Sequence, residues 1–197
     1  MFKKKLPNCN VLFKKFLSPW YPLHLRVVLP RPDLFLLPHL NVETLEVVVI
    51  NQIKEKLNLI REAYNKDFQL INVFEKLNLE VIDSVDTFFK EKEVLNLIKI
   101  SDPKDINNEY LIAISKFGLA LGDLFVETGK FEWVYSEPYF ESYVINYKTG
   151  YCIPVFDWAV KKFSSYGIND GFRFKFLKAI EFIEEEEIQI AHSGASL

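Results

Sequence analysis

The feature of the sequence that most constrains the fold is a predicted helix over about residues 105–128 that is apolar over most of its circumference. Only Lys116, Asp123 and Glu127 form a narrow polar edge. Because such a helix has to be covered on most sides, we expect it at the centre of the protein. Its apolar side chains recur every three or four residues, at Tyr110, Leu111, Ile114, Phe117, Leu121, Leu124 and Phe125.

Two glycines inside this helix indicate a close contact. Gly118 and Gly122 are four residues apart and leave a flat place on one face. A glycine costs about 1 kcal/mol relative to alanine in a helix interior, so a pair of them favours close approach of a neighbouring backbone. Gly129 is a natural stop for the helix.

Other helices are predicted on both sides of it. Residues 45–64 have apolar positions at helical spacing, although the β-branched run at 47–50 would also suit a strand. Further helices are expected over about 67–77 and 79–100, the latter ended by Ser101-Asp102-Pro103.

The pattern becomes that of strands after Gly129. Strands are predicted at 131–135, 143–147 and 151–153, with a short hairpin loop at 148–150. A short helix over 158–166, capped by Asp157, and a last helix from 170 or 171 to about 187 follow. The predicted class is therefore α+β, with a helical N-terminal two-thirds, a small antiparallel sheet (about 131–155) and closing C-terminal helices. We expect three parts: an arm (1–40), a single domain (41–188) and a disordered tail (189–197).

The arm differs from the rest of the chain in charge. Residues 1–32 carry seven basic residues and no acid, whereas the remainder has a net charge of −10. Such an arm could bind nucleic acid, an anionic membrane or an acidic partner, or it could lie on its own acidic body, for example on Glu184–Glu187.

The arm is also rich in proline and in large apolar side chains. Six prolines in the first 40 residues exclude long helices there. Large apolar groups left in water would favour aggregation, so we expect them to dock on the chain's own body or on a second copy, which would make a homodimer through residues 1–40. These side chains are Phe13, Phe16, Leu17, Trp20, Tyr21, Leu34 and Phe35.

Targeting signals and disulfides are not evident. Lys14, Lys15 and several prolines interrupt the apolar start, and the apolar stretch 34–50 contains proline, histidine and two acids. We therefore expect a soluble cytoplasmic protein with no membrane span. Two cysteines allow at most one internal disulfide, and Cys152, in a predicted strand, is expected to be a buried thiol.

Known catalytic and cofactor motifs are missing. The seven glycines are scattered, and the three histidines (His24, His39 and His192) form no metal-ligand spacing. We predict no catalytic residue, no metal and no cofactor. The alternative is a hydrolase-type site at Asp123, Glu127 and Glu132, if an apolar wall raised the pKa of one carboxyl group; otherwise these side chains are a solvated edge.

A dense aromatic band covers residues 133–158. Tyr and Trp are favoured at protein interfaces, although cross-strand packing would equally account for such a band. Nucleic acid is an improbable ligand because interleaved glutamates would repel phosphate. The predicted interface residues are Trp133, Tyr135, Glu137, Tyr139, Glu141, Tyr143 and Tyr147.

Part of the chain, residues 117–162, carries a weak family resemblance. The run Phe117-Gly118-Leu119-Ala120-Leu121-Gly122-Asp123 leads into Gly129-Lys130-Phe131-Glu132-Trp133, and Pro138-Tyr139, Ser142, Pro154, Trp158 and Lys161 follow. This pattern resembles loosely defined families of small bacterial proteins, some of them similar to immunity proteins. The resemblance implies a fold element and no catalytic residue.

Together these features predict a non-enzymatic protein–protein interaction module. An immunity-like protein would use acidic side chains to cover a basic toxin site and aromatic side chains as anchors.

Overall fold

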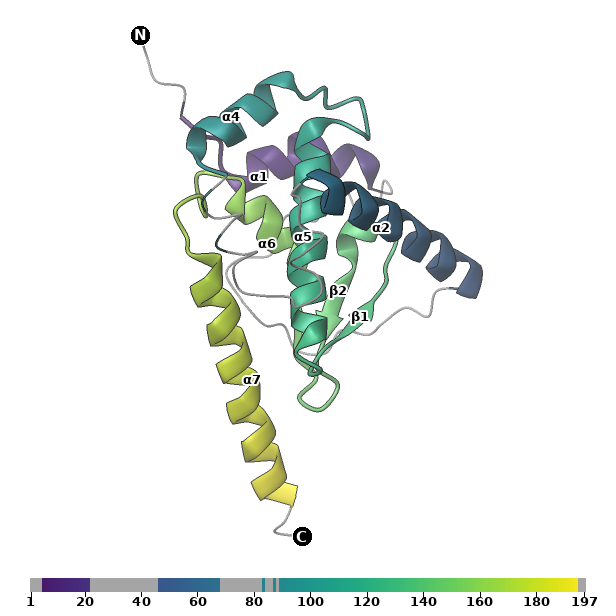
Figure 1. Ribbon diagram of the computed structural model, residues 1–197, viewed down its shortest axis with the longest axis vertical. Coiled ribbons are helices and arrows are strands. Elements are labelled where there is room, and N and C mark those ends of the chain that lie inside the picture. The colour runs from purple at the N-terminus through teal and green to yellow at the C-terminus, as the bar shows by residue number, and fades with distance from the viewer. Residues whose placement is uncertain (1–4, 22–45, 68–82, 84–86, 88, 195–197) are drawn as a thin grey trace.

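The computed structural model describes residues 5–21, 46–67, 83, 87 and 89–194. Their architecture is mostly helical, with one small antiparallel sheet, so the predicted α+β class is confirmed. Helix α5 (Glu109–Glu127) runs through the centre, with α2 (Val47–Asp67), α4 (Glu91–Ile100) and α6 (Val155–Lys162) around it (Figure 1). The predicted helix over 45–64 is thus confirmed as α2, and the strand alternative is wrong.

Helix α5 is buried on nearly all sides, as predicted. Asn108 caps its first turn by accepting a hydrogen bond from the backbone N–H of Leu111, at 3.0 Å. The helix ends before Gly129, whose φ of +71° is the left-handed conformation that glycine adopts readily. Both ends are therefore set by local sequence.

The glycine pair of α5 makes room for aromatic rings. A Cβ atom at Gly118 would lie 2.5 Å from a ring carbon of Phe156, and one at Gly122 would lie 2.1 Å from a ring carbon of Trp133. The glycine spacing predicted close approach of a neighbouring backbone, but the main occupants are side chains from α6 and from β1 (Glu132–Val134), the strand that follows α5.

The sheet has three short strands in the order β1 (Glu132–Val134), β2 (Tyr143–Ile145) and β3 (Cys152–Ile153). All neighbours are antiparallel, with Trp133 opposite Val144 and Val144 opposite Ile153. One face packs on α5 and α6, and the opposite face holds a second buried cluster. That cluster consists of Val134, Tyr143, Ile145 and Cys152, and the prediction that Cys152 is buried is confirmed.

The described part of the N-terminal arm packs on the chain's own body. It forms three short turns: α1 (Cys9–Leu12), a π-helical turn (Phe13–Leu17) and a 3₁₀ turn (Ser18–Trp20). Phe13, Phe16, Leu17 and Tyr21 are at most 2% exposed, and the Phe16 ring lies 4.6 Å from the ring of Tyr110 on α5. Docking in cis is confirmed for these residues, whereas Leu34 and Phe35 lie outside the described part.

The acidic run of the last helix, α7 (Phe172–Gly194), contacts residues next to the sheet. Lys130 contacts the carboxylates of Glu184 and Glu187, and Asn146 Nδ2 donates to Glu187 Oε1 at 2.9 Å. These contacts connect α7 to the loop before β1 and to the loop after β2. The suggestion that Glu184–Glu187 receives the basic arm stays a prediction, because most of the arm lies outside the described residues.

A buried lysine closes the turn between α6 and α7. Lys162 is 2% exposed, and its ammonium group donates to the backbone carbonyls of Ile168 and Asp170, at 3.3 and 3.0 Å. The same group lies 5.5 Å from the centroid of the Phe172 ring. The turn is thereby held around one cation.

Several predicted boundaries are corrected by the structure. The helix predicted over 79–100 is not continuous. Lys90 is extended, and α4 begins at Glu91. The short helix begins at Val155 rather than Trp158. Helix α7 continues to Gly194, so the predicted disordered tail is helical over 189–194. The helix predicted over 67–77 lies almost entirely outside the described residues.

Candidate functional site

The carboxylate that the enzyme alternative depended on is engaged in a structural contact. Arg61 of α2 binds Asp123 in a bidentate manner, with both N–O distances at 2.7 Å, and Trp133 Nε1 donates to Asp123 Oδ1 at 3.0 Å. The Asp123 side chain is only 15% exposed. One carboxylate thus joins α2, α5 and β1, an arrangement that suits structural support because both of its oxygens are already occupied.

The other two carboxylates of that alternative are more exposed than Asp123. Glu127 and Glu132 are exposed, at the end of α5 and the start of β1. Neither lines a described pocket. The structure therefore places Asp123 in a half-buried ion pair and leaves Glu127 and Glu132 on the surface.

The first residues of the aromatic band pack against α5 and α2. Trp133 lies on the flat place made by Gly122, and Tyr135 stacks on Trp133 with ring centroids 6.2 Å apart. Lys54 of α2 lies over the Tyr135 ring, and partial burial raises the pKa of that phenol. These two rings mainly connect elements of the fold.

The remaining band residues divide between core and surface. Tyr143 is buried on the second face of the sheet, and Tyr139 is buried with its hydroxyl 2.7 Å from Ser115 Oγ. Tyr147 and Glu137 are exposed. Glu141 is half-buried beside the Tyr21 hydroxyl, and burial followed by the Glu141 charge holds the pKa of Tyr21 far above its usual value.

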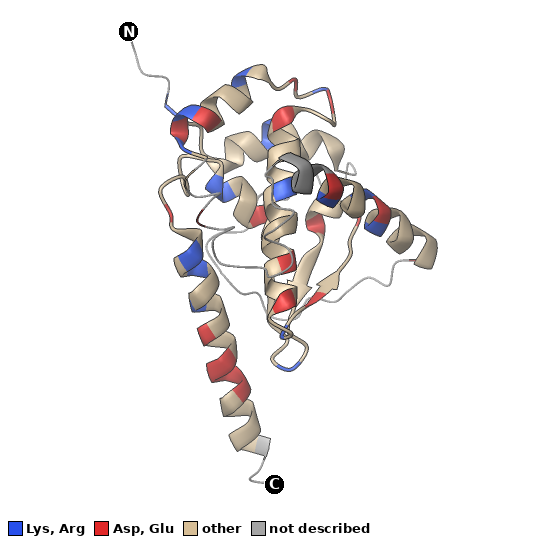
Figure 2. Cartoon of the chain, in the orientation of Figure 1, with Lys and Arg blue, Asp and Glu red and all other residues tan. Residues whose placement is uncertain are grey.

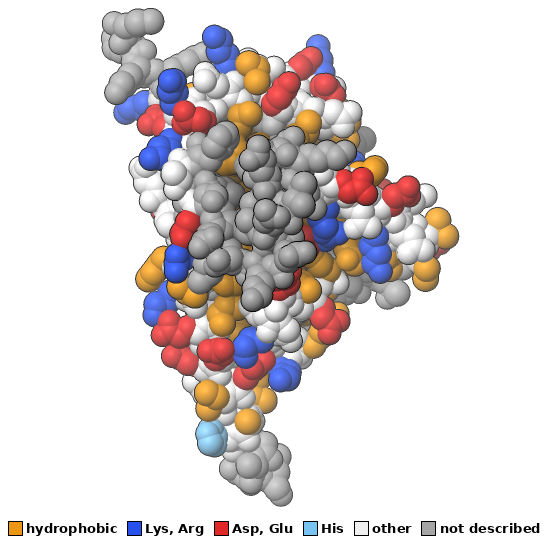
Figure 3. Space-filling model, viewed as in Figure 1, with side chains coloured by type: hydrophobic (Ala, Val, Ile, Leu, Met, Phe, Trp, Pro, Cys, Tyr) orange, Lys and Arg blue, Asp and Glu red, His pale blue; other side chains and the backbone are white. Residues whose placement is uncertain are grey.

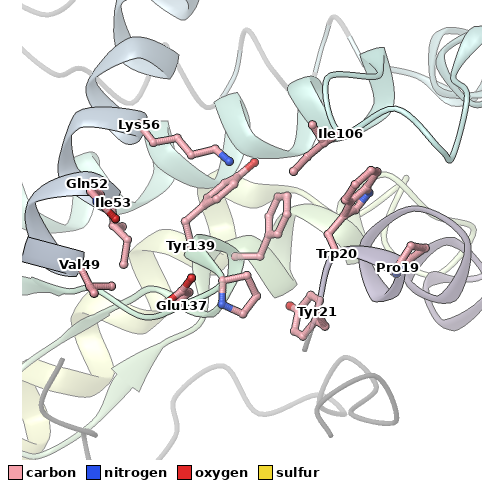
Figure 4. Close-up of a pocket in the computed structure, with 12 residues that line it drawn as sticks. Pro19, Trp20, Tyr21, Val49, Gln52, Ile53, Lys56, Ile106, Glu137 and Tyr139 are labelled. Atoms are coloured by element: carbon pink, nitrogen blue, oxygen red, sulfur yellow. The ribbon is translucent and has the colours of Figure 1, made fainter. Parts of the chain in front are cut away.

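A groove that the sequence did not reveal lies between α2 and the N-terminal half of α5. Its larger hollow, about 520 Å³, is bounded by α2, the 3₁₀ turn at Trp20, and Glu137–Phe140 (Figure 4). A second hollow of about 360 Å³ is lined by Leu59, Ile112 and Lys116 among others. Lys56, Ile106 and Tyr139 line both, so we treat the two hollows as one α2–α5 groove. Of the predicted interface residues, only Glu137 and Tyr139 contribute to it.

The α2–α5 groove is apolar except for a few polar groups. Its central cation is Lys56, whose ammonium group lies 4.6 Å from the centroid of the Tyr139 ring and points into the hollow in Figure 4. Partial burial lowers the pKa of Lys56. Within the described residues no carboxylate forms an ion pair with it. The groove can therefore offer a cation and an apolar wall to the same ligand.

A second exposed feature is the outer face of α7. Its inner face is buried through Phe172, Phe176, Ala179 and Ile183, whereas Phe174 is 66%, Leu177 45% and Ile188 56% exposed. Glu181 and Glu185 fall on the same outer row at helical spacing. The acids of α7 lie in its middle part, and the helix continues past them to Gly194, beyond the body (Figures 1 and 2). Apolar and acidic side chains both gather in the lower part of the molecule in Figure 3.

Similarity to known proteins gives no assignment. No family model, no curated protein and no solved structure matches this chain. In the described part of the chain, no three His, Cys, Asp or Glu side chains are grouped so as to hold a metal ion. None of the helices seen there combines the length and apolarity needed to cross a membrane.

Proposed function

We propose that the protein is a non-enzymatic protein–protein interaction module that binds its partner through the outer face of α7. The observation that carries the proposal is the row Phe174, Leu177, Glu181, Glu185 and Ile188, which is exposed on a helix extending beyond the body. Large apolar side chains repeated along one helix face are typical of helices that bind another protein.

The charge of this surface favours a basic partner. Glu181, Glu184 and Glu185 are exposed, and the helix carries its basic residues, Arg173, Lys175 and Lys178, nearer its start. Acidic side chains accelerate association with a basic surface and disfavour acidic partners. This is the arrangement that an immunity-like protein would use to cover a basic toxin site. The aromatic anchor is Phe174 on α7, because the predicted anchors Trp133, Tyr139 and Tyr143 are engaged in packing.

The enzyme alternative loses its main support. Asp123 is held by Arg61 and Trp133, and the other two carboxylates lie on the surface outside the described pockets. A general acid or base has to reach a substrate atom within hydrogen-bond distance, usually from a concave site. We therefore favour binding over catalysis.

Co-purification with matched variants tests the proposal. The tagged full-length chain is compared with Phe174→Ser/Leu177→Ser/Ile188→Ser and with Glu181→Lys/Glu185→Lys. The control is Val47→Ser/Val48→Ser, which changes two exposed apolar side chains on α2. We expect one partner to be retained by the wild type and the control and to be lost by both α7 variants.

The salt dependence of partner binding distinguishes the acidic contribution from the apolar contribution. The acidic contribution should weaken between low ionic strength and about 1 M salt, where the screening length falls to about 3 Å. Retention of the partner by both α7 variants would refute the proposed surface. Recovery of the chain alone at every salt concentration would count against a protein partner altogether.

A further inference from the structure

The α2–α5 groove leaves apolar side chains uncovered at its rim. Leu59 is 61%, Ile106 37% and Ile112 38% exposed, and they come from α2, the loop before α5, and α5 itself. The rings of Trp20 and Phe140 line the larger hollow, and the Tyr139 ring lines both. Small-molecule sites are concave, mostly apolar and commonly 300–1,000 Å³ in volume, so each hollow has a suitable size.

The charges of the groove select one kind of ligand. Lys56 lies at the centre, because it lines both hollows, and Lys116 lines the second one. Glu137 is the one carboxylate among the lining residues, and it lies on the side of Tyr139 away from the Lys56 ammonium group (Figure 4). An anionic group beside Lys56 would gain a charge-assisted hydrogen bond in a partly desolvated place.

We propose that the α2–α5 groove binds a small monocarboxylic acid with an apolar chain or ring. The carboxylate pairs with the Lys56 ammonium group, and the apolar part lies between Ile106 and the aromatic rings of Trp20 and Phe140. The site is separate from the outer face of α7, so it stands or falls independently of the proposed function.

Calorimetric titration of the full chain with octanoate tests the charge and the apolar wall together. Octanol has the same chain without the charge, and acetate has the charge without the chain. We expect octanoate to bind at least ~10-fold more tightly than octanol, since a charge-assisted hydrogen bond is worth about 1.5–3 kcal/mol. Acetate should show no measurable binding. Equal affinity for octanoate and octanol, or no binding of octanoate, would overturn the proposal.

Variants locate the site. Lys56→Met should remove the preference for octanoate over octanol, whereas Lys54→Met, on the same helix but over Tyr135 and outside the groove, should leave it unchanged. Ile106→Trp should fill the groove and reduce octanoate binding by ~10-fold or more, with a wild-type circular dichroism spectrum showing that the fold is retained. Octanoate binding that survives both Lys56→Met and Ile106→Trp would place the ligand elsewhere and refute the assignment.

Discussion

Helix α5 precedes the sheet in the sequence and helix α7 ends the described chain, and the two helices are used in opposite ways. The 19 residues of α5 are covered on nearly every side, with glycines placed where rings have to fit. The 23 residues of α7 cover the body with one face and expose apolar and acidic side chains on the other. Large apolar side chains thus serve stability in α5 and, in our proposal, recognition in α7. Substitutions on the two helices should separate these roles.

The largest effect is expected at the flat place of α5. Gly122→Ala puts a methyl group where the Trp133 ring lies, so the ring must move and its hydrogen bond to Asp123 is strained or lost. We expect a loss of about 3 kcal/mol in the free energy of unfolding, measured by urea denaturation. Adding Trp133→Val should recover part of this loss, and a double variant that is less stable by the full sum would contradict the steric explanation.

The next effect concerns the ion pair that joins α2 to α5. Asp123→Ala leaves Arg61 and the Trp133 indole without their shared acceptor, and we expect a loss of about 2 kcal/mol. A double-mutant cycle with Arg61→Ala measures the coupling between the two side chains. Additive effects of the two substitutions would show that the bidentate contact contributes nothing to stability.

A smaller, pH-dependent effect is expected where α7 meets the sheet loops. The hydrogen bond from Asn146, followed by those from Lys130, holds the pKa of Glu187 below its ordinary value of 4.5. The stability from its ionised form is therefore complete above that pH and is lost as the pH falls through the depressed pKa of the folded state. Glu187→Gln should lower Tm by about 3 °C at pH 7, which corresponds to about 1 kcal/mol, and the difference should vanish in acid. A difference that is constant with pH would exclude this origin.

The smallest effect on stability is expected on the outer face of α7. Leu177→Ser alters a side chain that is 45% exposed, so the free energy of unfolding should change by no more than about 0.5 kcal/mol. Partner binding in the co-purification assay should nevertheless weaken. A substantially larger loss of stability would show that this face is covered within the protein and would remove the distinction between α5 and α7.

Local patterns of the sequence predicted the elements but not their long-range contacts. The apolar circumference of α5, the stop at Gly129 and the hairpin loop are short-range signals, and each was read correctly. The pairing of Asp123 with Arg61 spans 62 residues and has no local signature. Glycine spacing indicated close approach, but it could not tell that Trp133 and Phe156 would be the occupants.

Most of the candidate-site residues could not be predicted from the sequence, for the same reason. The α2–α5 groove is assembled from the arm, α2, the loop before α5, α5 and Glu137–Phe140, so no single stretch of sequence indicates it. The aromatic band could serve an interface or cross-strand packing, and most of its rings are half-buried or buried. The extension of α7 to Gly194 was missed because the last residues, rich in small and polar side chains, resemble a tail.

The burial of Lys162 allows opening of the turn before α7 to be followed by chemical labelling. Lys162 is the one buried lysine in the part of the chain that the structure describes, and carbonyl groups of the turn surround its ammonium group. An acylating reagent modifies an exposed amine quickly, but it can reach this one only while the turn is open. The labelling rate of Lys162, followed by mass spectrometry of its peptide, would therefore measure how often the junction between α6 and α7 opens in the folded protein.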